Sequence, residues 1–210
     1  MDDRDRARFV HDLYEFNDTK LAGSTYYSFQ NLGLVNPDLP KRIRKKLVEI
    51  HGWALMKNHY HLLLSELVEG GLSLFLRKLN TGYANYFNLR HERKGTLFQG
   101  RTKKILIERQ THFLYILHYI HLNPLDYLKG FENWRERSKG HVPSAREALK
   151  YLETYRWSSY LDYAGKKNFP SLITKDLFEG KPGEYAADLR DYLQNAEEVE
   201  GDFATKLWLE

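Results

Sequence analysis

Residues 51–64 read HGWALMKNHYHLLL, and this stretch decides the expected fold class. Apolar residues on both sides of Lys57 and Asn58 are typical of two strands that a tight turn joins. Val48 and Ile50 extend the alternating pattern toward the N-terminus. The sequence therefore predicts an antiparallel hairpin, with a first strand from about residue 48 to 56 and a second from 59 to 64.

The segments around this hairpin show mainly helical patterns. Apolar residues recur at helical spacing over residues 2–17, 71–91 and 111–122, and Pro124 ends the third of these helices. The order helix, hairpin, helix, extended segment, helix predicts an α+β fold with an antiparallel sheet flanked by helices. The remaining predictions are an irregular stretch over 18–40, a basic helix over 41–46, an extended segment or hairpin over 96–108, a linker over 125–143, and helices over 144–155 and 184–195.

The composition limits the kinds of chemistry and location. The chain has 210 residues and no cysteine, so it has no disulfide, no thiolate zinc site and no cysteine nucleophile. The charged start MDDRDRARF is unlike a signal peptide, and no apolar run approaches the ~18 residues of a membrane span. We therefore expect a soluble, cytoplasmic protein without a membrane partner.

Charge is distributed unevenly along the chain. Residues 176–210 hold ten acidic and three basic residues, which leaves 29 basic and 18 acidic residues in 1–175. A basic body with an acidic tail favours a polyanionic partner for the body, although an ordinary solvated basic surface remains an alternative. The tail either covers the basic face when nucleic acid is absent or includes an amphipathic helix packed on the core.

His59 and His61 flank a single tyrosine in the second predicted strand. Residues i and i+2 of a strand point to the same face, so both imidazoles can approach one metal ion. Nine histidines in 210 residues give such a pair by chance about 0.4 times, so the motif needs support from its surroundings.

That support comes from residues 119–124, which read YIHLNP. Tyr119 and Asn123 share one helix face, and Tyr115 lies one turn earlier on it. A phenol beside a metal site suits nucleophilic attack on a phosphodiester, with the metal stabilising the phosphate oxygens. The alternative is a tyrosine at the edge of the core with a hydrogen-bonded hydroxyl. The metal or a base such as His121 could help to remove the phenol proton, although the sequence favours a structural role for His121 over a role as a metal ligand.

A basic segment between these two motifs suits nucleic-acid contact. Residues 95–104 read GTLFQGRTKK, in which Arg101, Lys103 and Lys104 can contact phosphates and Phe98 can stack on a base. The basic residues just before it, Arg90, Arg93 and Lys94, complete the candidate DNA-binding set.

Together these motifs resemble a known family. LMKNHYHLLL is similar to the histidine-hydrophobe-histidine (HUH) motif of IS200-like single-stranded DNA transposases. GTLFQGRTKK, HYIHLNPL and YRWSSYLDYAG resemble later motifs of one subgroup, the REP-associated tyrosine transposases. The resemblance runs from about residue 2 to 165 and includes four motifs in the family's order.

The resemblance implies a ferredoxin-like sheet, a helical C-terminal extension and a metal-dependent transposase activity. The implied ligands of Mg²⁺ or Mn²⁺ are His59, His61 and Asn123, and the implied nucleophile is Tyr119, which becomes linked to the 5′-phosphate of cut single-stranded DNA. The implied partner is single-stranded DNA beside a hairpin, bound by a monomer or a homodimer. The implied boundaries are a catalytic domain over 1–130 and an extension over 131–210.

Two departures from the family pattern accompany the resemblance. The chain begins within the first helix, where the family usually has a preceding strand, so we expect the N-terminal strand of the sheet to be missing. Lys57 replaces a proline that is usual in the family's turn. A domesticated, non-catalytic protein that binds DNA hairpins remains the main alternative, and an RNA-binding sheet of the RRM type is weaker because the RNP1 pattern is absent.

Overall fold

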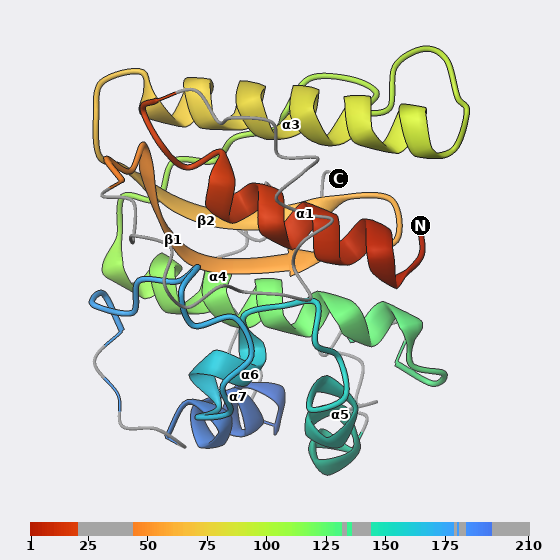
Figure 1. The fold of residues 1–210 in the computed structure, drawn as a ribbon. Coiled ribbons are helices and arrows are strands. Elements are labelled where there is room, and N and C mark those ends of the chain that lie inside the picture. The colour runs from red at the N-terminus through yellow and green to blue at the C-terminus, as the bar shows by residue number, and fades with distance from the viewer. Residues whose placement is uncertain (21–43, 132–133, 136–143, 179, 181–183, 195–210) are drawn as a thin grey trace, which may run out of the picture. The chain divides into compact units, whose positions relative to one another are not determined.

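The structure is a computed structural model that describes residues 1–20, 44–131, 134–135, 144–178, 180 and 184–194. The chain divides into two compact units (Figure 1). Unit 1 comprises Met1–Ile50 and Leu64–Arg101, and unit 2 comprises His51–Leu63 and Thr102–Glu210. Unit 2 therefore combines residues from both sides of the boundary predicted near residue 130. Within the described ranges, the structure contains no helix with the length and apolar character needed to span a membrane.

The α+β class that the sequence predicts is confirmed, with a β-hairpin as its sheet. Strands β1 (Val48–Leu55) and β2 (Tyr60–Glu66) form a two-stranded sheet among the described residues. The amide of Met56 donates to the carbonyl of His59 at 2.8 Å, which closes the turn at Lys57 and Asn58 as the sequence predicted. Every position of β1 except Glu49 is buried, so this strand is covered on both faces.

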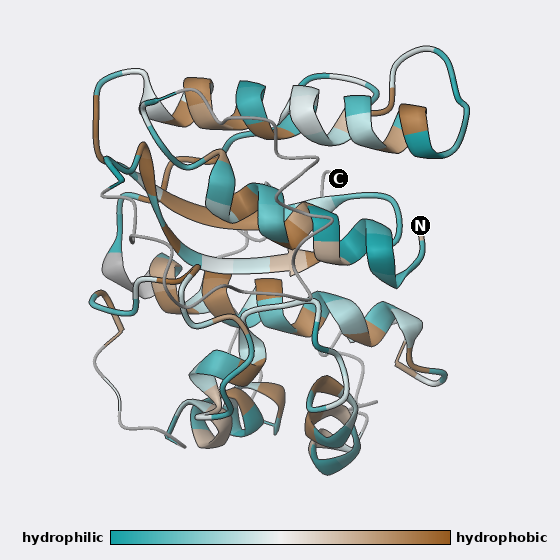
Figure 2. Cartoon of the chain, in the orientation of Figure 1, coloured by the Kyte–Doolittle hydropathy of each residue, from teal (hydrophilic) through white to brown (hydrophobic). Residues whose placement is uncertain are grey.

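Unit 1 contains α1 (Asp3–Glu15), α3 (Gly71–Arg90) and the base of the hairpin. A capping box starts α1, since the Asp2 carboxylate accepts from the Asp5 amide and the Asp5 carboxylate accepts from the Asp2 amide, both at 3.0 Å. The ring of Phe9 meets that of Tyr83 edge-on with centroids 5.1 Å apart, so the two helices pack through aromatic side chains. Figure 2 shows the N-terminal turns of α1 as hydrophilic and β2 as mostly hydrophobic.

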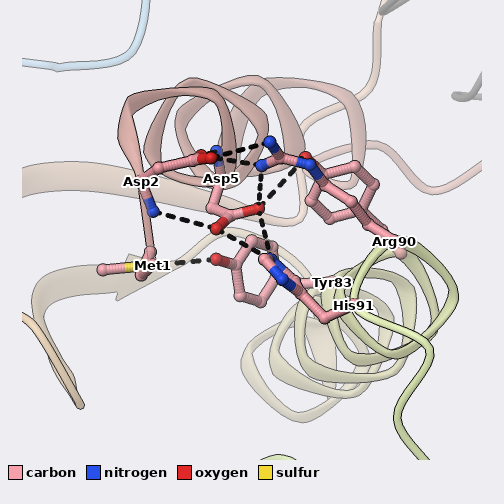
Figure 3. Close-up of polar contacts among 7 residues, drawn as sticks. Met1, Asp2, Asp5, Tyr83, Arg90 and His91 are labelled. Carbon is pink, nitrogen blue, oxygen red and sulfur yellow. Dashed lines mark hydrogen bonds and ion pairs between the residues drawn. The ribbon is translucent and has the colours of Figure 1, made fainter.

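A charged cluster ties the end of α3 to the start of α1 (Figure 3). The Arg90 guanidinium donates to Asp2 at 2.7 Å and to the fully buried Asp5 at 2.5 Å. His91 Nε2 lies 3.0 Å from the Asp5 carboxylate. The hydrogen bond from Arg90 holds the pKa of Asp2 well below its usual range. Asp5 is therefore the acceptor on which this end of unit 1 converges.

Unit 2 packs helices against the tip of the hairpin. Helix α4 (Gln110–Leu122) runs directly into the 3-10 helix η1 (Asn123–Tyr127), and α5 (Ala145–Leu152), α6 (Tyr160–Tyr163) and α7 (Glu184–Gln194) follow. Figure 1 shows α4 between the hairpin and the helices α5, α6 and α7. One hydrophobic core joins Ala54 and Leu63 of the hairpin to Leu117 of α4 and Leu189 of α7.

The segment YRWSSY fastens the first strand to this core. The carbonyl of Trp157 accepts from the Leu55 amide at 2.9 Å, and the Ser159 amide donates to the Trp53 carbonyl at the same distance. Ser158 forms an antiparallel bridge with Ala54. The YRWSSY segment therefore adds backbone hydrogen bonds to β1 beyond those of the hairpin.

Several local predictions hold, and others need correction. The three main predicted helices and the helices over 144–155 and 184–195 are confirmed within a few residues at each end. The predicted basic helix over 41–46 is wrong for residues 44–46, which have no regular structure, and 21–43 lie outside the described residues. No strand is assigned within residues 96–108. The predicted linker over 125–143 is wrong for residues 125–131, because η1 and the buried Leu125 and Phe131 belong to the core.

Candidate active site

The hairpin turn brings the two candidate metal-binding histidines together. The Nε2 atoms of His59 and His61 lie 3.0 Å apart, and the ring planes are nearly perpendicular. Asn58 Oδ1 lies 2.8 Å from His59 Nδ1, and because this oxygen can only accept, Nδ1 carries the proton and Nε2 presents a lone pair. His59 is therefore already in the tautomer that a metal ion requires at Nε2.

Both imidazoles are held in the neutral form. Burial and, to a smaller extent, the neighbouring His59 together lower the pKa of His61 to about 3. Desolvation likewise lowers the pKa of His59, which lies exposed at the turn. Neutral imidazoles are the form that binds metal ions, so neither ring has to lose charge. Because His59 Nε2 accepts at 3.0 Å from His61 Nε2, the His61 proton has to move from Nε2 to Nδ1 before both Nε2 atoms can bind one metal ion.

A close approach of α4 to the hairpin brings Tyr119 to the histidines. A Cβ atom at Gly52 would lie 2.7 Å from Leu117 Cδ1, so the Leu117 side chain of α4 packs directly over the backbone of β1 at this glycine. Two residues further along α4, the Tyr119 ring meets that of His61 edge-on, with centroids 5.9 Å apart. The candidate nucleophile is thus in contact with the buried member of the histidine pair, and only 4% of its surface is exposed.

Asn123 lies beside Tyr119, and its side-chain oxygen is already hydrogen-bonded. Asn123 Nδ2 donates to the Tyr119 carbonyl at 2.9 Å, and Arg135 Nη2 donates to Asn123 Oδ1 at 2.5 Å. Arg135 also makes a two-pronged ion pair with Asp126, at 2.6 and 2.9 Å. The oxygen that would serve as the third metal ligand is therefore shared with a guanidinium group.

The Nε2 atoms of His59 and His61 are spaced to fill two coordination positions of one divalent cation. With metal–nitrogen bonds of roughly 2.1 Å, two ligands at a right angle would have nitrogens roughly 3 Å apart, which matches the histidine pair. Among the described residues, no group of three or more His, Asp or Glu side chains is arranged to hold a metal ion. The remaining positions would fall to Asn123 Oδ1, water and substrate oxygens.

The predicted DNA-binding residues have different surroundings. In unit 1, Arg93, Lys94 and Arg101 are exposed, and Arg93 lies 5.7 Å from the Phe87 ring. Phe98 is partly buried, with its ring 6.2 Å from that of Tyr83. The Arg90 donors already bond Asp2 and Asp5, so its DNA contact stays a prediction that competes with these carboxylates. In unit 2, Lys103 and Lys104 are exposed.

The other residues considered around the nucleophile have structural contacts. His121 is fully buried, with Nδ1 2.6 Å from the Tyr185 hydroxyl and Nε2 2.7 Å from Ser159 Oγ. Both ring nitrogens are occupied, which supports the structural alternative for this histidine over a role as a proton acceptor. The Tyr115 ring packs edge-on against Tyr192 of α7 at 5.7 Å.

The sequence reasoning missed Asp126, Trp134 and Arg135, because it treated residues 125–143 as a linker. Trp134 Nε1 donates to Asp126 Oδ1 at 2.7 Å, and its ring lies 5.8 Å from that of Tyr119. Phe131 and Trp134 were the available signal, since large aromatic residues are atypical of linkers and both are buried.

Comparison of the chain with known proteins found no matching family model, and no curated protein or solved structure with significant similarity.

Proposed function

We propose that the protein is a metal-dependent single-stranded DNA endonuclease and strand transferase of the tyrosine transposase type. The observation that supports this most directly is the 3.0 Å separation of the His59 and His61 Nε2 atoms, with the Tyr119 ring against His61. A paired imidazole donor set next to a helix-borne phenol suits metal-assisted phosphodiester transfer better than a purely structural cluster.

The proposed reaction transfers the phosphoryl group at the 5′ end of the cut DNA to Tyr119. Tyr119 Oη attacks the phosphorus in line, a phosphotyrosine bond forms with the 5′ end, and the bond to the 3′ oxygen breaks. Tyr119 loses its phenol proton and the departing 3′ oxygen gains one, so the step has no net change in protons. The energy of the broken bond is kept in the phosphotyrosine, so a 3′-OH of another strand can reverse the step without a further cofactor.

The implied metal is Mg²⁺ or Mn²⁺, which supplies charge stabilisation to the phosphate when bound. His59 and His61 would hold it through Nε2, and Asn123 through Oδ1 after giving up its bond to Arg135. Burial of Tyr119 beside His61 excludes water from the nucleophile, because the phenol has little exposed surface. The hairpin turn keeps both donors in place, since Tyr127 Oη accepts from the Lys57 amide at 2.7 Å.

The proposed substrate is single-stranded DNA next to a hairpin, in the cytoplasm, bound by a monomer or a homodimer. The positive charge of residues 1–175 supports a polyanionic substrate. The proposed finer fold is ferredoxin-like, and the hairpin with α1, α3 and α4 supplies part of that element order.

The test is formation of a covalent protein–DNA adduct. Incubation with a 3′-labelled DNA hairpin carrying single-stranded flanks and Mn²⁺ should give a labelled band at the mass of protein plus DNA on a denaturing gel. Tyr119→Phe should abolish this band and keep DNA binding, whereas the control Tyr115→Phe should retain both. An adduct that persists in Tyr119→Phe would place the nucleophile elsewhere.

A second candidate function is DNA-hairpin binding without catalysis. The bond between Arg135 and Asn123 Oδ1 favours it, because it occupies the third ligand. Salt-sensitive DNA binding by the wild type with no cleavage in either Mg²⁺ or Mn²⁺ would support this candidate over the transposase.

A further inference from the structure

Arg135 holds a central position in the candidate active site, although nothing in the sequence motifs pointed to it. Its guanidinium bonds Asp126 through two donors and Asn123 through one. It also lies 5.7 Å from the centre of the Tyr119 ring and 4.4 Å from that of the Trp134 ring. Both residues that the proposed reaction uses on α4 and η1 are therefore in contact with one positive charge.

The orientation of this guanidinium is fixed from several sides. Asp126 receives the two-pronged pair and also the Trp134 indole proton at 2.7 Å, so the carboxylate itself is held in place. The guanidinium carbon lies 4.4 Å from the centre of the fully buried Trp134 ring. An arginine anchored in this way loses little further conformational entropy when it binds an oxyanion.

The positive charge of the site with the proposed metal bound would favour binding of an anion. Asp126 pairs with Arg135, and the two charges act in opposite directions on both imidazoles. The proposed metal at His59 and His61 would add two positive charges that repel Arg135. A phosphate between the metal and Arg135 would relieve that repulsion. About a quarter of the Arg135 side chain is exposed, so an incoming ligand can reach it.

We propose that Arg135, positioned by Asp126 and Trp134, is the phosphate-binding cation of this site and exchanges the Asn123 oxygen for a phosphate oxygen of single-stranded DNA. The inference rests on the proposed function in taking DNA as the ligand. In the free protein the guanidinium holds Asn123 Oδ1. In the DNA complex the phosphate takes this donor, and Asn123 becomes available to the metal. Arg135 thus couples DNA binding to completion of the metal site.

The proposed exchange predicts two independent effects of the Arg135→Gln substitution. The variant should bind DNA more weakly, because one guanidinium–phosphate contact is lost. The slope of log affinity against log salt should fall by about one counterion. In the absence of DNA, the same variant should bind Mn²⁺ severalfold more tightly than the wild type, because a positive charge is removed and Asn123 Oδ1 is released.

The experiment measures both quantities on the full chain. DNA binding is followed by fluorescence anisotropy of a labelled hairpin with thymidine flanks, in EDTA, over a series of salt concentrations. Mn²⁺ binding is followed by calorimetry without DNA. Arg135→Lys should keep the salt slope, since the charge remains. Arg156→Gln is the matched control, because Arg156 is an exposed arginine of unit 2 that also lies close to a tryptophan ring, 5.1 Å from that of Trp157.

The outcomes separate this inference from the proposed function. An unchanged salt slope in Arg135→Gln, or a loss equal to that of Arg156→Gln, would overturn the role of Arg135 whether or not the wild type cuts DNA. A reduced slope together with no covalent adduct in the wild type would retain the phosphate site and reject the transposase activity. Failure of the wild type to bind the hairpin at low salt would overturn both.

Discussion

His59 and His61 show how much two residues can determine. Their spacing predicted a shared face, and their Nε2 atoms are 3.0 Å apart. The spacing could not predict that Asn58 would select the His59 tautomer or that Tyr119 would contact His61, because both depend on contacts outside the motif. At this scale the sequence identified the candidate ligands, and the surrounding side chains determine their protonation.

Removal of either histidine should abolish high-affinity metal binding. His61→Ala and His59→Ala should each weaken Mn²⁺ binding by about 100-fold or more, since one of two nitrogen donors is lost. Calorimetry measures this without DNA. His112→Ala, at the start of α4, is the control and should leave the affinity unchanged. Equal affinities in His61→Ala and His112→Ala would show that the pair is not a metal site.

The buried carboxylate of Asp5 should contribute more to the free energy of unfolding than the exposed carboxylate of Asp3. Asp5→Asn keeps the shape but removes the charge that Arg90 and His91 face, so we expect a loss of about 2 kcal/mol in the free energy of unfolding. Asp3→Asn breaks the exposed pair with Arg6 and should cost under about 0.5 kcal/mol. Urea unfolding measures both, and equal losses would contradict a special role for Asp5.

Among the elements, helices and the hairpin were predictable, and the short connecting structures were not. Leu79 and Tyr83 mark a helix face through local spacing, and both are buried as α3 requires. The 3-10 helix η1 has no such periodicity, and its residues are ordered by core burial of Leu125 and by the Asp126–Arg135 pair. Elements held by long-range contacts therefore escaped a reading based on local pattern.

The packing of α1 on α3 depends on the absence of a side chain at Gly82. A Cβ atom there would lie 2.3 Å from the Phe16 ring, which is rigid and buried. Although alanine is the better helix former by about 1 kcal/mol, we expect Gly82→Ala to destabilise unit 1 by about 1–3 kcal/mol through overpacking.

A second variant separates the two effects at Gly82. In a Phe16→Leu background the clash is reduced, so adding Gly82→Ala should become neutral or stabilising relative to Phe16→Leu alone. Thermal melts of the four proteins form a double-mutant cycle. If the stability changes of the two substitutions are additive, the clash with the Phe16 ring is not the cause of the destabilisation by Gly82→Ala.

At the level of the whole molecule, the sequence predicted the α+β class but not how the chain is shared between units. Unit 1 contains the base of the hairpin and unit 2 contains its tip, His51–Leu63. The tip packs with residues more than a hundred positions later in the chain, such as Trp157 and Ser159. Such long-range pairing leaves no periodic signal. In the acidic tail, Tyr185, Leu189 and Leu193 of α7 are buried, as the packed-helix alternative predicted, and residues 179, 181–183 and 195–210 lie outside the described residues.

The core of unit 2 should limit stability at both ends of the pH scale. Ser159 Oγ donates to the Trp53 carbonyl, so it accepts from His121 Nε2–H, and His121 Nδ1 accepts from the Tyr185 hydroxyl. Burial lowers the pKa of His121 well below 6.5 and raises that of Tyr185 well above 10. The stabilisation from neutral His121 is present above pH 6.5 and is lost as the pH falls. The stabilisation from neutral Tyr185 is present below pH 10 and is lost as the pH rises.

Tyr160 adds to the alkaline loss, because burial raises its pKa to about 12, so its neutral form is also favoured in the folded state. Urea unfolding between pH 5 and pH 11 should therefore show a plateau from about pH 6.5 to about pH 10 with a decline on each side. His121→Gln should make the acid decline shallower, with a remainder from His59 and His61, whose pKa values are also lowered. Tyr185→Phe should make the alkaline decline shallower and leave the acid side as in the wild type. If both declines keep their wild-type steepness in these variants, the pH limits arise outside this buried pair, and the hydrogen bonds that hold α4 and α7 to the YRWSSY segment do not depend on its protonation.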